Sequence, residues 1–416
     1  MTSPAAVGAY RGATTLHSER VVAPARLARI QSIDILRGLV MILMAIDHIR
    51  DFFHAGAMHF SPEDLTQTSV PLFFTRWITH FCAPVFIFLA GTSAYLSIGR
   101  KQSRSAVSYF LCTRGLWLVV VEMTLIEVAA MGNFSFNPII WQVIWAIGWS
   151  MVALSVLMFV PWATLLCLSV ATIALHNAFD RVPPEQLGSL GWLWKILHVG
   201  FATIAISPQH TALVVYPLIP WIAVMSAGYC FGRVMELDPV RRRRFLFQLG
   251  GAVTAGFIVL RMLNGYGDPS PWTPQPRAMM TLVSFLRTTK YPPSLAYLMM
   301  TLGPSFMVLG ALEGVTVGTA NPFLVFGRVP MFYYIIHWYT LHAVAIGFAW
   351  VRYGRVAFLF SPPPSLLPNP SYPPDYGYPL WVVYAVWISI VCGLYFPCRW
   401  FAGIKARHQR AWLSYL

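Results

Sequence analysis

The sequence predicts an all-α polytopic membrane protein with about ten transmembrane helices and both termini in the cytoplasm. Three observations favour this class: the composition, the long apolar segments and the distribution of basic residues. Hydrophobic residues make up 57% of the 416-residue chain, and charged residues only 11%. A soluble domain carries about 25% charged residues, so we expect most of this surface to face a lipid bilayer.

Ten segments are long and apolar enough to cross a bilayer, which takes about 20 residues in a helix. They are residues 33–53, 74–99, 107–130, 139–160, 162–179, 212–232, 245–263, 294–312, 323–350 and 380–401. Residues 187–206 form a weaker segment, which we expect to lie at the membrane interface or to re-enter the membrane.

Basic residues divide unevenly between the two sides of this topology. With the N-terminus inside, the inner segments carry sixteen Lys and Arg residues and the outer loops carry seven. The positive-inside rule therefore places both termini in the cytoplasm. It also accounts for the run from Arg241 to Arg244 and for much of the net charge of +14. Nucleic acid is not expected as a partner, because no basic face with interleaved aromatic residues is present.

The chain divides into three expected parts. Residues 1–30 form a flexible basic tail that contains four arginines and no apolar core of a signal peptide. Residues 31–403 form the transmembrane domain, and residues 404–416 form a basic cytoplasmic tail. The six cysteines lie in or beside apolar stretches without a CxxC pair, so we expect them to be packing residues.

Charges gather at the end of the first predicted helix. Nine uncharged residues are followed by Asp47, His48, Arg50, Asp51 and His54. Ionisable groups inside a membrane helix are costly and suggest function. Spacings of three and four residues place acid, base and imidazole on neighbouring faces, where a carboxylate can fix the tautomer and the pKa of a histidine. The alternative is an ordinary Asp47–Arg50 ion pair at the interface.

The second predicted helix adds Arg76 and His80, four residues apart. Because it runs antiparallel to the first helix, His48 and His80 are expected at one level, roughly 8 to 9 Å below the membrane surface at 1.5 Å per residue. Later helices contribute further titratable groups to this polar chamber: Glu122, Glu127, His337 and His342. The two later histidines could equally be core residues among aromatic side chains.

No metal site is predicted. His48 and His54 are six residues apart, and His337 and His342 are five apart. Neither pair has the spacing of four residues that places two ligands on one helical face.

Other charges lie at the cytoplasmic end of the bundle. Asp34 and Arg37 form a pair three residues apart, and Arg114 and Arg328 are expected near them. These arginines could bind an anionic ligand that enters from the cytoplasm. The alternative is that each of them only contributes to the positive-inside pattern.

Two stretches carry a family resemblance, SIDILRGLVMILMAIDHIRDFF and HFCAPVFIFLAGTSAYLS. They resemble the bacterial branch of the heparan-alpha-glucosaminide N-acetyltransferase catalytic-domain family, within the transmembrane acyltransferase superfamily. The resemblance continues in YPLIPWIAVMSAGYCFGR, TKYPPSLAYLMMTLGP and FGRVPMFYYIIHWYTLH. It implies a bacterial inner-membrane enzyme that uses acyl-CoA, by analogy acetyl-CoA, as donor substrate and holds no tightly bound cofactor.

The resemblance also implies roles for single residues. His48 falls where the eukaryotic enzyme has a functional asparagine. The catalytic histidine of that enzyme lies in the next loop, which here offers His54 and His59. His80 replaces an acidic residue that precedes the proline of the second helix, here Pro84. Because a histidine in place of an acidic residue changes which groups can donate or accept a proton, both N-acylation of a glucosamine and O-acylation of an envelope glycan stay open.

The leading hypothesis is an acyltransferase with an outward-facing carbohydrate acceptor, in the lipid bilayer, either alone or as a homo-oligomer. His48, His54 or His59 would act as general base, oriented by Asp47 or Asp51, and transfer through an acyl-imidazole stays open. His80 is a further candidate for a catalytic role. Arg50 and Arg76 are expected to stabilise the developing oxyanion. His59, Glu127 and His342 are further candidates for binding the substrate, and Arg37 and Arg328 are candidates for binding the donor.

The alternative function is a proton-coupled transporter that uses the intramembrane His and Asp residues. A third possibility is a scaffold without chemistry.

Overall fold

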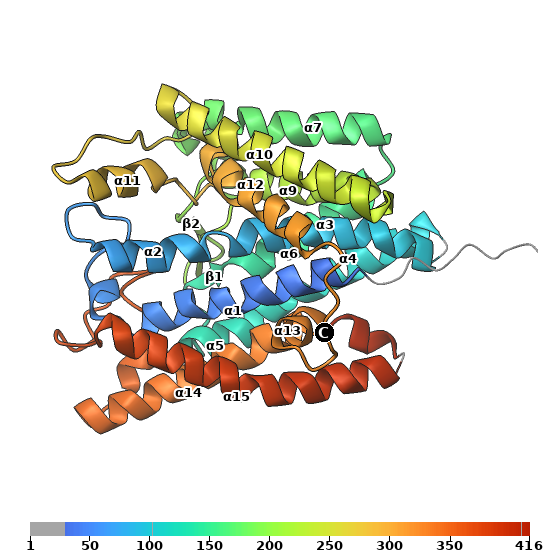
Figure 1. Cartoon of the computed structure of the whole chain (residues 1–416). Helices are drawn as coiled ribbons and strands as arrows, with labels where there is room; N and C mark the ends of the chain where they lie inside the picture. The colour runs from blue at the N-terminus through green and yellow to red at the C-terminus, as the bar shows by residue number, and fades with distance from the viewer. Residues whose placement is uncertain (1–29, 102, 409) are drawn as a thin grey trace, which may run out of the picture.

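The computed structural model describes residues 30–101, 103–408 and 410–416. Long helices run side by side and form one bundle (Figure 1). The helices are α1 Gln31–Phe53, α2 Val70–Thr79, α3 Cys82–Lys101, α4 Arg104–Val121, α5 Glu127–Met131, α6 Val143–Leu157, α7 Trp162–Leu175, α8 Gly191–Leu197, α9 Leu218–Phe231, α10 Pro239–Leu263, α11 Ala278–Leu286, α12 Leu295–Leu312, α13 Pro322–Arg328, α14 Pro330–Tyr353 and α15 Leu380–Arg407. The predicted N-terminal tail falls almost entirely outside the described residues.

Each of the ten predicted segments contains a helix. Eight helical stretches of the described chain are long and apolar enough to span a membrane. The other two predicted segments hold α1, which carries five charged residues, and α6, which has only 15 residues. The all-α membrane class is thus confirmed, whereas the orientation of the termini remains a prediction.

The second predicted segment is interrupted, contrary to the prediction of one helix over residues 74–99. Residues between Thr79 and Cys82 separate α2 from α3. Pro84 explains the break, because proline has no backbone N–H and its ring clashes with the carbonyl four residues earlier. That carbonyl belongs to His80, and it accepts a hydrogen bond from the Tyr297 hydroxyl instead, at 2.8 Å.

Three short strands form a small sheet that the sequence analysis did not predict. They are β1 Ile139–Trp141, β2 Ala202–Ala205 and β3 Thr211–Val214, with β3 in the middle, parallel to β1 and antiparallel to β2. Two predicted helical segments therefore begin as strands, and the segment over residues 187–206 contains α8 and β2. β-branched residues in these stretches favour extended backbone. The residues that follow β1 and β3, Gln142 and Val215, line a cavity inside the bundle.

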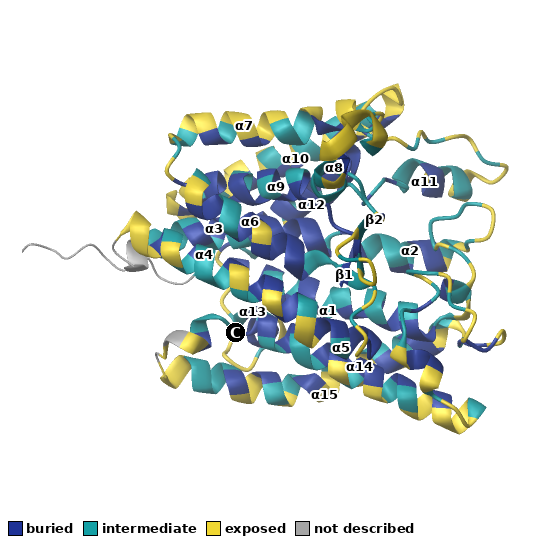
Figure 2. Cartoon of the chain, turned by 180° about the vertical axis from the view of Figure 1, so that it is seen from behind, coloured by how far each residue is buried: buried dark blue, intermediate teal, exposed yellow. Residues whose placement is uncertain are grey.

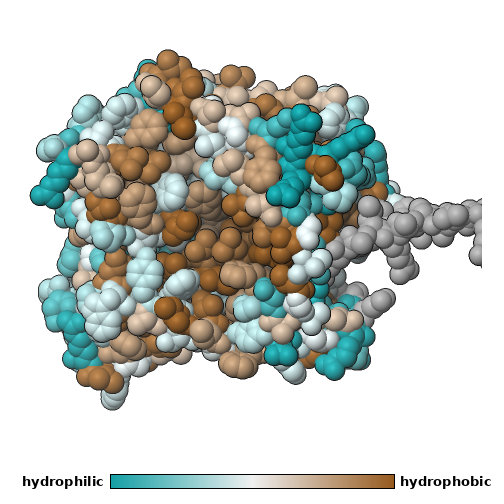
Figure 3. Space-filling model, viewed as in Figure 1, coloured by the Kyte–Doolittle hydropathy of each residue, from teal (hydrophilic) through white to brown (hydrophobic). Residues whose placement is uncertain are grey.

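The burial pattern fits a bundle surrounded by lipid. Figure 2 shows α1, α3 and α12 mostly buried, whereas α7, α10 and α15 expose many residues. The exposed side chains of these outer helices include large apolar ones, such as Leu263, Trp381 and Phe396. On the face in Figure 3, hydrophobic side chains gather over the middle and hydrophilic ones toward both ends of the helices.

Two glycines allow α1 and α13 to cross in direct contact. A Cβ added at Gly38 would lie 1.8 Å from the backbone oxygen of Phe323, and one at Gly327 would lie 1.8 Å from that of Asp34. Any larger residue would therefore force the two backbones apart. The crossing matters for the site because Arg37 and Arg328 adjoin these two glycines.

Candidate active site

A cavity of about 820 Å³ runs along one face of α1. The lining residues of α1 recur every three or four positions, as one face of a helix requires. They include Asp34, Arg37, Met41, Met44, Asp47, His48 and Asp51. From Arg37 to Asp51 the helix rises about 21 Å at 1.5 Å per residue, which is most of a hydrocarbon core of about 30 Å. The cavity therefore joins regions near the two ends of the bundle.

Four basic residues line one end, which we call the arginine end: Arg37, Arg114, Arg328 and Lys405. Arg37 donates a hydrogen bond to Ser93 Oγ at 2.7 Å and pairs with Asp34 at 3.3 Å. The Arg114 guanidinium lies 5.7 Å from the centre of the Phe110 ring. The structure thus brings together the inner arginines that the sequence singled out, and their cations can meet an anion inside the cavity.

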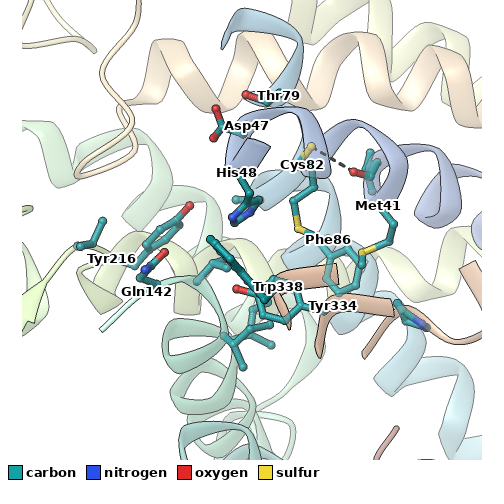
Figure 4. Close-up of a pocket in the computed structure, with 18 of the residues that line it drawn as sticks. Met41, Asp47, His48, Thr79, Cys82, Phe86, Gln142, Tyr216, Tyr334 and Trp338 are labelled. Carbon is teal, nitrogen blue, oxygen red and sulfur yellow. Dashed lines mark hydrogen bonds between the residues drawn. The ribbon is translucent and has the colours of Figure 1, made fainter. Parts of the chain in front are cut away.

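His48 faces the middle of the cavity between α1 and α14 (Figure 4). Its imidazole ring packs edge to face against Trp338, with centroids 4.0 Å apart, and lies 5.2 Å from His337. Within the described part of the chain, His48 has no hydrogen bond to Asp47 or Asp51. Aromatic side chains pack around this imidazole, and His48 lines the cavity.

The carboxylates beside His48 are paired with arginines instead. Asp47 forms ion pairs with Arg50, at 2.8 Å, and with Arg76. Asp51 lies 2.6 Å from Arg50. Arg76 also reaches Glu63, at 3.2 Å. This network ties α1 to α2. Among the described residues, no hydrogen bond from either aspartate to His48 supports the predicted orienting role.

His80 lies away from the cavity, behind this network. Its side chain is buried, and its Nε2 lies 2.8 Å from Glu63 Oε1. Burial acts to raise the pKa of Glu63, but the His80 and Arg76 side chains outweigh it and lower the pKa to about 2. His80 is therefore a partner of Glu63 and, unlike His48, does not line the cavity.

The loop histidines differ in their surroundings. His59 lines the cavity, whereas His54 does not. His54 follows the end of α1 and pairs with Tyr378 through a short parallel bridge. Burial and the neighbouring Arg50 charge lower the pKa of His54, so its imidazole is neutral at pH 7.

Glu127 and His342 tie segments of the bundle together and do not line the cavity. Glu127 accepts hydrogen bonds from Asn133 Nδ2 at 2.7 Å and from the Ile140 backbone N–H at 3.1 Å. His342 Nδ1 lies 3.1 Å from the backbone oxygen of Ala129. These contacts connect α5 with β1 and α14.

Lys290 is a cavity residue that the sequence-based prediction counted only among the seven basic residues of the outer loops. It is 6% exposed and lines the cavity at the end opposite the arginines. Its ammonium lies 5.2 Å from the centre of the Tyr291 ring and 5.8 Å from that of Tyr216. No described carboxylate forms an ion pair with it. Its only signal in the sequence was a lone lysine before a Tyr-Pro-Pro run, which is too weak to identify a site.

These features define a polytopic membrane protein whose bundle encloses a polar chamber between a group of cations and an acid–base network. The family described as heparan-alpha-glucosaminide N-acetyltransferase, catalytic, matches residues 29–260, which is more than half of the chain. The chain belongs to this family, and the resemblance seen in its sequence is confirmed. The matched part holds His48, Arg76 and Glu63 but not Lys290. None of the curated proteins compared with the chain matches it.

Proposed function

We propose that this protein is a bacterial inner-membrane acyltransferase that moves an acyl group, by family analogy acetyl, from cytoplasmic acyl-CoA to a carbohydrate outside. The observation that carries the proposal is the single cavity that links the arginine end to His48 and Lys290. Family membership supplies the acyltransferase class, and the positive-inside rule assigns the arginine end to the cytoplasm.

The donor would enter at the arginine end. Coenzyme A carries several phosphate groups, and arginine forks bind phosphate through paired charge-assisted hydrogen bonds. With its phosphates near Arg37, Arg114 and Arg328, the long thiol arm would extend along α1. Met41 and Met44 line this part of the cavity, and their flexible apolar side chains suit such an arm. The thioester would then lie near His48.

His48 would act as the general base. It takes the proton from the acceptor hydroxyl or amine as the acceptor oxygen or nitrogen attacks the acyl carbonyl. The C–S bond then breaks, the new C–O or C–N bond remains, and His48 returns the proton to the departing thiolate. Lys290 would stabilise the oxyanion, because Arg50 and Arg76 are already paired with carboxylates. An acyl-imidazole on His48 uses the same residues in two steps.

The acceptor would occupy the end of the cavity opposite the arginines. Its lining combines a carboxylate, a histidine and aromatic rings: Glu63, His59, Phe201 and Tyr291. Such groups can bind sugar hydroxyls and stack on sugar rings. They accommodate either a hydroxyl or an amino group, so both O- and N-acylation fit.

The test is acyl transfer by the purified protein in detergent, with radiolabelled acetyl-CoA and with glucosamine or envelope glycans as acceptors. We expect His48→Gln to keep donor binding and to lose about 10²- to 10⁴-fold in turnover, as general-base loss does. His210→Gln is the matched control, because His210 is exposed and lies away from the cavity. Full activity of His48→Gln would reject this residue as base, and no consumption of acetyl-CoA by the wild type would reject the enzyme.

A proton-coupled transporter is the second candidate, since a cavity that reaches toward both ends of a bundle also suits solute passage. A transporter would move solute into sealed vesicles without consuming acyl-CoA. The same preparation can be tested for uptake under a proton gradient, and uptake together with no acyl transfer would favour this function.

A further inference from the structure

Two histidines and an aspartate converge outside the cavity, where the chain leaves α7 and where α8 ends. They are His176, Asp180 and His198, and one ligand atom from each lies within 4.8 Å of the other two. None of them lines the central cavity. His176 begins a short 3-10 helix that follows α7, and Asp180 is the residue that ends it.

Both imidazoles are buried with unused nitrogens. His176 and His198 are each 3% exposed. Among the described residues, no hydrogen bond of good geometry reaches either ring nitrogen of His176 or Nδ1 of His198. The Pro293 backbone carbonyl lies near enough to accept from one His176 nitrogen, which leaves the other nitrogen of that ring for a ligand. Buried polar atoms without partners are rare in native proteins and call for an explanation. A bound metal ion would supply the missing partner.

Neighbouring residues hold the ligands as an outer shell does in metal proteins. Two of the ligands already face each other, with Asp180 Oδ1 3.0 Å from His198 Nε2. From outside the ligand set, Asn177 Nδ2 donates a hydrogen bond to Asp180 Oδ2 at 2.8 Å. Asn177 in turn accepts a hydrogen bond from the Leu295 backbone N–H at 2.8 Å. The Trp194 ring stacks on the His198 ring, with centroids 4.7 Å apart. Such partners orient metal ligands and raise affinity.

We propose that His176, Asp180 and His198 bind one divalent transition-metal ion. Two imidazoles and one carboxylate, with a water in the fourth position, form a ligand set that Zn²⁺ takes. This proposal departs from the sequence-based expectation of no metal site. Ligand atoms of a tetrahedral Zn²⁺ lie roughly 3.4 Å apart for bonds of about 2.1 Å, so binding would draw the widest pair inward. The Asp180 side chain is 15% exposed, which gives the ion a path to the site.

The ion would connect three elements. His176 and Asp180 follow α7, His198 ends α8, and Asn177 links the site to the first residue of α12. Lys290 and Tyr291 lie a few residues before α12, so the ion would stabilise the part of the bundle that carries this end of the cavity. The proposed role is structural and does not depend on the proposed acyl transfer.

The test uses the full-length protein in detergent, stripped with a chelator and titrated with Co²⁺ and Zn²⁺. We expect one ion per chain, visible absorption bands of four-coordinate Co²⁺, and a higher unfolding temperature with Zn²⁺. His176→Phe and Asp180→Asn should abolish stoichiometric binding, and Asn177→Ser should weaken it about 10- to 100-fold. His210→Phe is the control, because it removes an exposed histidine away from the cluster.

Wild-type protein that binds no stoichiometric Co²⁺ or Zn²⁺ would overturn the proposal and leave the cluster as a hydrogen bond beside a packed histidine. Equal binding by His176→Phe and His210→Phe would overturn it as well. If a variant does not fold, the Co²⁺ spectrum of the wild type still decides, since an unbound or surface-bound ion lacks the four-coordinate bands.

Discussion

Arg37 and His48 lie eleven residues apart on one face of α1, and both line the same cavity. At 1.5 Å per residue, their backbone positions are about 16 Å apart along the helix axis. A charged group bound at Arg37 and a reacting group at His48 can therefore belong to one elongated ligand. This relationship is the basis of the donor arrangement proposed above, and four predictions follow from the residues around it.

Replacing Arg37 should weaken donor binding. Arg37→Ala removes a charge-assisted contact worth about 1.5 to 3 kcal/mol, so we expect a roughly ten- to hundredfold rise in the KM for acetyl-CoA. Arg37→Lys should have a smaller effect. The control is Arg241→Ala, because the Arg241 side chain is 83% exposed. A KM that stays unchanged in well-folded Arg37→Ala would show that Arg37 has a structural role only.

A bulky residue in the middle of the cavity should block it. Met44 lines the cavity between Arg37 and His48, and Met44→Trp would fill the path of the thiol arm. We expect at least a tenfold loss of transfer with the fold intact, measured by acetyl-CoA consumption. Met262→Trp places the same residue on α10 at a position that is 68% exposed and should leave transfer unchanged. Equal activities of the two variants would exclude this route.

Removing the Lys290 charge should slow turnover more than it weakens binding. Lys290→Met keeps most of the side-chain volume and removes the ammonium. Loss of an oxyanion partner typically costs about 10²- to 10³-fold in kcat, whereas the KM for the donor should change little. Lys195→Met is the matched control, since Lys195 does not line the cavity. A variant with wild-type kcat would contradict the assignment.

The Glu63 network should lose stability in acid. The pKa of Glu63 is about 2 in the folded protein and 4.5 ordinarily, so its stabilising effect is complete above pH 4.5 and is lost as the pH falls toward 2. We expect the unfolding temperature of Glu63→Gln to fall less than that of the wild type between pH 5 and pH 3. Glu185→Gln, which alters an exposed carboxylate, should behave like the wild type. Parallel curves for all three proteins would refute this role of Glu63.

Much of the fold could be predicted from the length of the apolar segments alone. A segment that crosses a membrane must make its backbone hydrogen bonds internally, as a helix does, and needs about 20 apolar residues to span the hydrocarbon core. The ten predicted segments all contain helices. The sheet was missed because its strands are only three or four residues long and adjoin apolar helices. In such runs the hydrophobic pattern does not separate strand from helix.

The candidate site was predicted only in part. Helical spacing predicted that the acid, base and imidazole groups at the end of α1 lie on neighbouring faces. That Arg37 lines the same cavity as Asp47 and His48 is a finding of the structure. The prediction placed His48 and His80 at one depth and could not report their partners: His80 binds Glu63, whereas His48 lines the cavity. Lys290 comes from a loop distant in sequence, and single-sequence patterns do not report such contacts.

The most direct test of the central claim is transfer across a sealed membrane. The protein is reconstituted into proteoliposomes, and protease access to the C-terminus distinguishes right-side-out from inside-out molecules. Labelled acetyl-CoA is then supplied on one side of the membrane and the carbohydrate acceptor on the other. We predict labelled acceptor only when donor and acceptor face opposite ends of the cavity, with the donor at the arginine end, and none with His48→Gln. Labelled acceptor formed only when both substrates are on the same side would contradict the account.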